Sequence, residues 1–162
     1  MTQTQLPITD VVGQLAAVLR EGFEGPPGSS SYFTDSRRNT GLFGTLDPIT
    51  AEQASTPFAG STIVAHVHHL VFSLEASSAW IRGDHSLRDW GSSWRVSKAD
   101  DAGWAKLRDN LRRGHADLQK AIDEHAADGV DAVGGAVAVV AHVAYHLGAI
   151  RQKTAALKER AS

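Results

Sequence analysis

The sequence predicts an all-α protein, an antiparallel four-helix bundle with a long connection between its first and second helices. Apolar residues recur at spacings of three and four in four long segments, which is the period of one helix face. Clusters of glycine, proline and serine separate these segments. The 162 residues show no internal repeat and no linker, so we expect residues 1–162 to form a single domain.

The first helix is expected over residues 9–23, with the Thr9 hydroxyl as its N-cap. The sequence Gly-Pro-Pro-Gly at 25–28 ends it. From there to about residue 50 the chain shows little periodicity, and connections of this length are uncommon in compact domains. Its aromatic and leucine residues predict that it packs on the bundle, and a short helical turn is expected at residues 51–54.

The second helix is expected over residues 61–82, and residues 83–96 form a loop with two tryptophans. The third helix is expected to begin near Ser97, because Ser97 and Asp100 resemble a capping box.

The fourth helix is expected over residues 130–157, and its first half is almost wholly apolar, which predicts the most buried helix of the four. Residues 133–150 lack Asp, Glu, Lys and Arg, but they are rich in Ala and Gly and contain two histidines. We therefore interpret them as a bundle helix and expect no membrane span.

Composition excludes several functional classes. The chain has no cysteine, which rules out disulfides, thiolate nucleophiles and Cys-type metal clusters. The formal net charge is −2, and basic residues alternate with acidic ones, so we expect no nucleic-acid partner. The polar N-terminus, residues 1–6, lacks the pattern of a signal peptide, and we expect a cytoplasmic protein.

The histidines are the residues whose pattern indicates a metal-binding site. His142 and His146 are separated by four residues, so they share one helix face and could bind one ion. His66, His68 and His69 cluster on the second helix. Helix periodicity alone leaves His66 and His69 as equal candidates for a third ligand. A three-histidine site with an open position is typical of catalytic metal centres, and it suits zinc, nickel, cobalt or iron.

Residues 61–71 and 142–152 together resemble the DinB/YfiT-like family of four-helix bundles. The resemblance rests on a His followed by Leu in the second helix and on a late HxxxH followed by Leu and Gly. It implies a divalent metal bound by His69, His142 and His146, with zinc or nickel favoured, and a homodimer. The helix order and lengths fit the family along the whole chain, although Ala149 and Phe72 depart from its usual residues.

Other residues near the histidines are candidates for supporting roles. The candidates for a general acid or base are Tyr145, Ser73 and His66. The candidates for substrate binding are Arg151, Trp90 and Trp94.

The resemblance implies an enzyme that acts on a small-molecule substrate, most often by transferring a low-molecular-weight thiol to an electrophile. Two alternatives stay open from the residues alone. One is a metal-dependent hydrolase, which the open coordination position allows. The other is a non-catalytic, stress-related metal-binding or dimerisation bundle.

Overall fold

The computed structural model describes residues 6–161 and confirms the all-α prediction, with no strand in this range. Most of the polar N-terminal segment considered above lies outside these residues. The elements in chain order are α1 (Ile8–Glu24), α2 (Leu42–Leu46), α3 (Ala51–Ser55), α4 (Ile63–Ile81), the 3₁₀ helix η1 (Trp90–Trp94), α5 (Asp101–His125) and α6 (Val130–Ala161).

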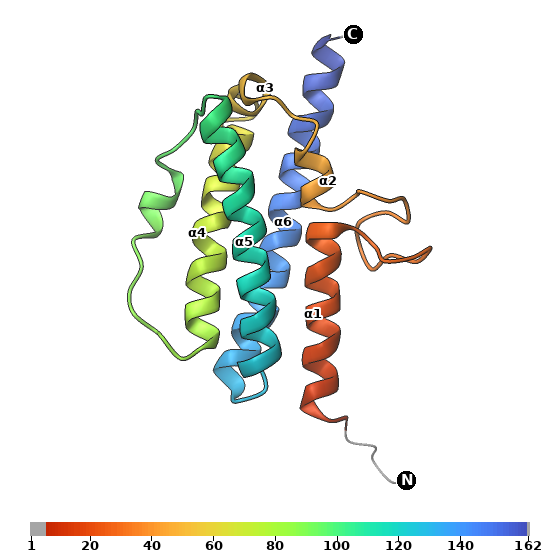
Figure 1. Ribbon diagram of the computed structural model, residues 1–162, viewed down its shortest axis with the longest axis vertical. Helices are drawn as coiled ribbons and strands as arrows, with labels where there is room; N and C mark the ends of the chain where they lie inside the picture. The colour runs from red at the N-terminus through yellow and green to blue at the C-terminus, as the bar shows by residue number, and fades with distance from the viewer. Residues whose placement is uncertain (1–5, 162) are drawn as a thin grey trace.

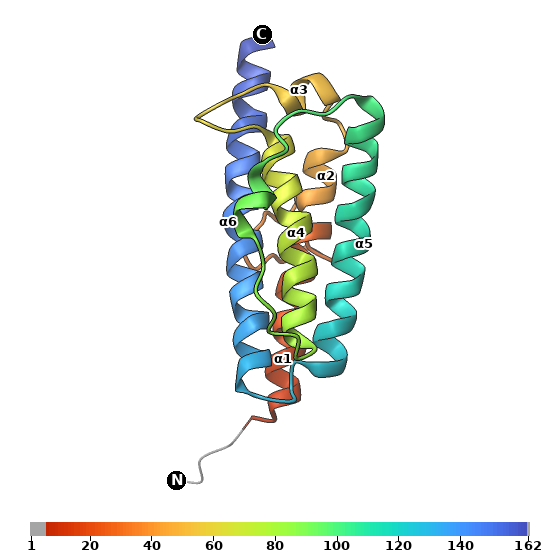
Figure 2. The same ribbon diagram turned by 90° about the vertical axis from the view of Figure 1, so that its left-hand side faces the viewer.

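Four long helices, α1, α4, α5 and α6, lie side by side along the long dimension of the molecule (Figure 1). Helix α4 contacts both α5 and α6, and α1 contacts the same two helices. The loop that contains η1 runs along the outside of α4 (Figure 2), so it covers one long side of this helix.

Helix starts follow capping chemistry, with two differences from the sequence prediction. The hydroxyl of Thr62 accepts from the N–H of Ala65 and starts α4. The carboxylate of Asp100 caps α5, whereas the carbonyl of Ser97 accepts a hydrogen bond from the Thr62 hydroxyl at 2.8 Å. The predicted Ser97 cap is therefore wrong, because the N-cap of α5 is Asp100, whose carboxylate accepts from the N–H of Gly103. The predicted Thr9 cap is also wrong, because α1 starts at Ile8, directly after Pro7, and has no side-chain cap.

The core lies between the four long helices, and α4 contributes more buried residues to it than α6. The prediction that the fourth helix is the most buried is wrong. Val130, Val137 and Tyr145 of α6 are 84%, 50% and 70% exposed. Position explains the difference: α5, α6 and the η1 loop surround α4, whereas one face of α6 has no neighbour in the described chain.

By length and composition alone, α6 is apolar enough to cross a membrane over Val130–Arg160. Core helices of soluble proteins meet the same criteria.

The long connection after α1 is attached to that helix by one buried carboxylate. The oxygens of Glu21 accept hydrogen bonds from the backbone N–H groups of Tyr32, Phe33 and Thr34 at 2.8, 2.9 and 2.9 Å. They also accept from the hydroxyls of Ser31 at 2.7 Å and Thr34 at 2.9 Å. A segment with little periodicity thus gains a fixed path through a single side chain.

Candidate metal centre

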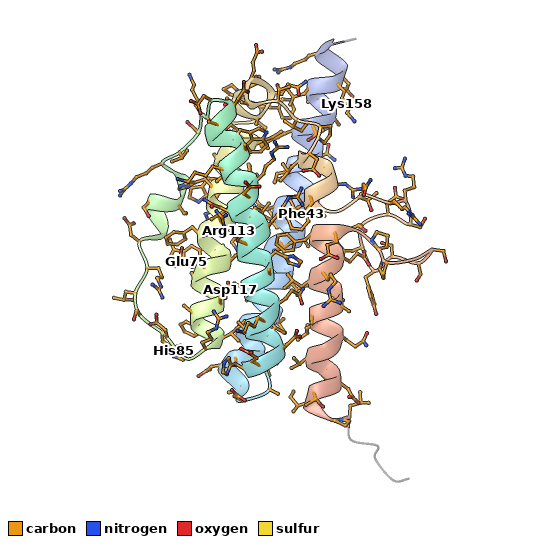
Figure 3. All side chains as sticks on the ribbon, in the orientation of Figure 1. Phe43, Glu75, His85, Arg113, Asp117 and Lys158 are labelled. Carbon is orange, nitrogen blue, oxygen red and sulfur yellow. The ribbon has the colours of Figure 1, made fainter. Side chains whose placement is uncertain are left out.

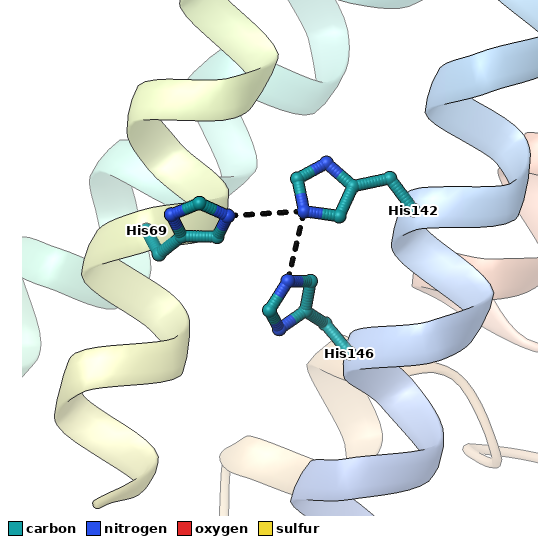
Figure 4. Close-up of side chains that lie close together, drawn as sticks. All are labelled: His69, His142 and His146. Atoms are coloured by element: carbon teal, nitrogen blue, oxygen red, sulfur yellow. Dashed lines mark hydrogen bonds between the residues drawn. The ribbon is translucent and has the colours of Figure 1, made fainter. Parts of the chain in front are cut away.

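Three imidazoles from two helices meet at one point. His69 projects from α4, and His142 and His146 project from successive turns of α6 (Figure 4). The Nε2 atom of His142 lies 3.0 Å from Nε2 of His69 and 2.8 Å from Nε2 of His146. One ligand atom from each residue lies within 4.8 Å of the others, so the group could hold a metal ion.

Each of the three rings also has a partner on its outward nitrogen, Nδ1. The partners are Ser93 Oγ for His69 at 2.7 Å, Ser73 Oγ for His142 at 2.8 Å, and His66 Nδ1 for His146 at 2.9 Å. Partners of this kind fix the orientation of metal-binding imidazoles and choose which nitrogen carries hydrogen. The arrangement leaves all three Nε2 atoms directed inward.

The hydroxyl of Ser93 determines the hydrogen position on His69. Ser93 Oγ donates its only hydrogen to the carbonyl of Trp90 at 2.6 Å. It can therefore only accept from His69, so the hydrogen of the neutral ring lies on Nδ1. The Nε2 lone pair of His69 is then free to bind a cation.

His66 lies behind the three inward-facing rings. It is 6% exposed, and its Nε2 atom is 2.9 Å from the hydroxyl of Ser61 while its Nδ1 atom faces His146. Both of its nitrogens are thus engaged away from the point where the three Nε2 atoms meet. The structure groups His69 rather than His66 with the HxxxH pair.

The four histidines are neutral at physiological pH. Burial, with a smaller contribution from the neighbouring His142, lowers the pKa of His69 to about 4. Burial likewise lowers the pKa of His66 to about 4 and that of His146 to about 3, with smaller effects from nearby charges. Burial also lowers the pKa of His142. Protons therefore compete little with a metal ion for these lone pairs.

Aromatic side chains cover the site from the η1 loop. The ring of Trp94 stacks on His69 with centroids 4.3 Å apart, and Trp90 packs edge-on against Phe72 at 5.2 Å. The ring of His68 donates from Nδ1 to the carbonyl of Ser93 at 2.7 Å, which attaches the loop to α4. The two tryptophans that the sequence marks for substrate binding therefore lie beside the histidines.

The remaining candidates divide between positions near the site and away from it. Ser73 is 1% exposed and contacts His142, as described above. Tyr145 is 70% exposed, and its ring meets His146 edge-on at 5.1 Å. The guanidinium of Arg151 instead donates to the carbonyl of Thr34 at 3.1 Å, so it holds the long connection and does not face the histidines.

The donor set fits a divalent transition metal. Three neutral imidazole nitrogens suit zinc, nickel, cobalt or iron, and they leave at least one coordination position open. In the described part of the chain, no Asp or Glu is hydrogen-bonded to His66, His69, His142 or His146. The site thus lacks an adjacent carboxylate base.

Ser93 is the functional residue that the sequence did not indicate. It lies 24 positions from His69 in a loop without periodicity, and serine is common in loops. The only signal nearby is the pair of tryptophans that flank it.

Compared with models of known families, with curated proteins and with solved structures, this chain shows no match.

Proposed function

We propose that this protein binds one divalent metal ion, zinc or nickel in the first place, through the Nε2 atoms of His69, His142 and His146. Cobalt and iron suit the same donors. The observation that supports the proposal is the combination of three inward Nε2 atoms with three outward hydrogen-bond partners. This is the arrangement of imidazole ligands and the groups that orient them.

A cation explains the close approach of these nitrogens better than hydrogen bonds among them. The Nε2 atom of His142 has at most one hydrogen, yet it lies within hydrogen-bonding distance of two other ring nitrogens. The Nε2 atom of His69 has none, because its hydrogen is on Nδ1. An ion about 2.0–2.1 Å from each nitrogen would accept all three lone pairs at once.

We further propose that the chain is a single-domain, antiparallel four-helix bundle of the DinB/YfiT-like type. Two contacts support opposite directions for α4 and α6. Ser73 lies beside His142, whereas the indole N–H of Trp80 donates to the carbonyl of Asp131 at 3.3 Å. From the first contact to the second, the residue number rises along α4 and falls along α6, so the two helices run in opposite directions. The resemblance of residues 61–71 and 142–152 to the DinB/YfiT-like family supports the assignment to this type of bundle.

The reaction that we propose is transfer of a low-molecular-weight thiol to a small electrophilic substrate. A metal ion held by His69, His142 and His146 would bind a thiol at its open coordination position, lower the pKa of that thiol and so supply a thiolate. The sulfur would then form a bond to a carbon of the electrophile while the bond from that carbon to its leaving group breaks. The leaving group would keep the bonding electron pair, and the thiol proton would go to solvent. Hydrolysis is less favoured because it needs a base for water, and no carboxylate contacts the four histidines in the described residues.

A non-catalytic metal-binding bundle is the second candidate. The same lack of a carboxylate favours it, because the described residues offer no acid or base beside the ion except hydroxyls and histidines. Thiols distinguish the two candidates. In the transferase, a small thiol should raise the melting temperature of the zinc-loaded protein and leave that of the metal-free protein unchanged.

The decisive test of metal binding is elemental analysis of untagged protein. We expect about one equivalent of metal in the wild type and in His125→Ala, a partly exposed histidine on α5. Both His69→Ala and His142→Ala should lose it, with helical circular dichroism retained. Absence of metal from the wild type, even after incubation with zinc or nickel, would contradict the proposal.

We also propose a cytoplasmic homodimer with no nucleic-acid or membrane partner. Lack of cysteine supports the compartment, and the exposed apolar face of α6 supports dimerisation. Contacts of α6 with both α1 and α4, and its histidines, argue against a lipid-facing helix.

A further inference from the structure

A cavity of about 590 Å³ opens between α4, the first half of α6 and the loop before η1. Ser73 and His142 line it at one end. Val130, about three turns of α6 before His142, and Asp84, just after the end of α4, line its other end. Its volume is in the range of sites that bury a small organic molecule. The cavity thus begins at a proposed metal ligand and extends away from it.

Apolar and aromatic side chains form much of the wall of this cavity. They include the side chains of Trp80, Leu87, Trp90, Ala138 and Val139. Flat indole rings and small aliphatic groups favour an apolar, preferably aromatic, occupant.

The wall formed by Trp80 is held in place from three sides. The ring of His85 stacks on it with centroids 4.0 Å apart, and His85 lies beside the end of α4 (Figure 3). The indole N–H binds the carbonyl of Asp131. Gly135 allows the close approach, since a Cβ there would lie 2.9 Å from Cδ1 of Trp80. This side of the cavity is therefore preformed.

The charges at the rim argue against an anionic occupant. The guanidinium of Arg88 is paired with the carboxylate of Asp84 at 2.6 Å. The other carboxylate in the lining belongs to Asp131. With its one guanidinium neutralised and a further negative charge nearby, the cavity offers no free cation to an acid.

We infer that this cavity binds the uncharged aromatic, or similarly apolar, part of the electrophilic substrate, with the reacting end directed toward His142. The inference rests on the proposed function for the role of the ion. The binding of an apolar group in the cavity can be tested without the ion.

Gly134 gives the means to test it. This residue lines the cavity, and a Cβ built on it meets nothing within 4 Å. Gly134→Leu should therefore fill the cavity without straining the helix. Gly148 on the same helix also has open space around its Cβ but does not line the cavity. Gly148→Leu is the matched control, because both changes replace a helical glycine with the same residue.

The first probe is N-phenyl-1-naphthylamine, an uncharged dye whose fluorescence rises in apolar sites. We expect one dye per chain in the wild type and in Gly148→Leu, with or without zinc, and about tenfold or more weaker binding in Gly134→Leu. Equal binding to all three proteins, or no binding to the wild type, would overturn the inference. This arm gives its answer whether or not the protein binds metal.

The second probe links the cavity to the ion. In the cobalt-loaded protein, visible absorption reports ligands that enter the open position. We expect 4-phenylimidazole to bind about tenfold more tightly than imidazole in the wild type and in Gly148→Leu, and this advantage to disappear in Gly134→Leu. An advantage that survives in Gly134→Leu would place the phenyl group elsewhere and overturn the inference. Failure to bind cobalt would instead contradict the proposed function.

Discussion

Ser93 accepts a hydrogen bond from His69 and donates its own hydrogen to the carbonyl of Trp90. These two bonds hold the imidazole in the neutral form that presents Nε2 to a metal. A side chain outside the three-histidine group therefore determines whether the Nε2 lone pair of His69 is available to the metal ion that we propose. Loss of such an orienting partner commonly costs tenfold to a hundredfold in metal affinity.

Ser93→Ala should accordingly weaken zinc binding by about tenfold to a hundredfold, because His69 loses the partner that fixes its hydrogen on Nδ1. Competition with a chromogenic chelator measures the change. Ser92→Ala is the matched control, since its exposed hydroxyl binds only the carbonyl of Asp89 within the same turn. Equal affinities in the two variants would show that the Ser93 bond does not orient the ligand.

At this scale, residue spacing alone predicts the histidine pair but does not select the third histidine, whereas the family resemblance names His69, which the structure groups with the pair. The spacing of His142 and His146 places them on one face of any helix. His66, His69 and Ser73 follow one another at spacings of three and four, so they share one helix face and periodicity cannot separate the two histidines. What separates them is a contact between distant segments, because Ser61 and His146 hold His66 behind the site.

At the scale of elements, the tether between α1 and the long connection depends on an ionised carboxylate. Burial raises the pKa of Glu21, but the N–H groups of Phe33 and Tyr32 and the hydroxyl of Ser31 outweigh burial and lower it to about 2. An unfolded chain would titrate this group near 4.5. The folded structure therefore stabilises the ionised carboxylate of Glu21 more than the unfolded chain does.

Glu21→Gln should lower the free energy of unfolding at pH 7 by roughly 3 kcal/mol, because an amide replaces a carboxylate that accepts five hydrogen bonds. The carboxylate contribution is complete above about pH 4.5 and is lost as pH falls through about 2. Urea unfolding of both proteins at several pH values should show the difference shrinking over this window.

Glu75→Gln on α4 is the control for this change, since Glu75 is an exposed carboxylate (Figure 3). It should leave stability unchanged within about 0.5 kcal/mol. A difference between wild type and Glu21→Gln that stays constant down to pH 2 would contradict the linkage.

Most elements are predictable because their signals are local. The second helix, expected over residues 61–82, is observed as Ile63–Ile81. The η1 helix spans only five residues, too few for a periodic pattern. Local sequence does not determine how buried α6 is, because an apolar sequence is compatible with both a core position and an exposed face. Its neighbours decide which applies.

At the scale of the whole molecule, that exposed face of α6 is the feature that a single chain leaves unexplained. Val137 and Tyr145 project from it, and neither lines the cavity described above. Apolar faces of this kind commonly mark contacts between proteins. A second copy of the chain is the occupant that we propose.

Light scattering after size exclusion should give twice the 17.3 kDa mass of one chain. Val137→Glu should shift the protein to a monomer, because the contact would bury an unpaired charge. Ala105→Glu on the exposed side of α5 should remain dimeric. A monomeric wild type, or a dimer that tolerates Val137→Glu, would place the association elsewhere or exclude it.

The chain connectivity of the histidine site also has a consequence for its assembly during synthesis. His69 and its partner Ser93 are 24 residues apart, whereas His69 and His142 are 73 apart. Ribosomes make the chain from the N-terminus, and closing a shorter loop costs less entropy. His69 can therefore acquire its orienting partner while α6 is still unmade. In the nascent chain, His69 is oriented first, and the three-histidine group is completed only once His146 has emerged.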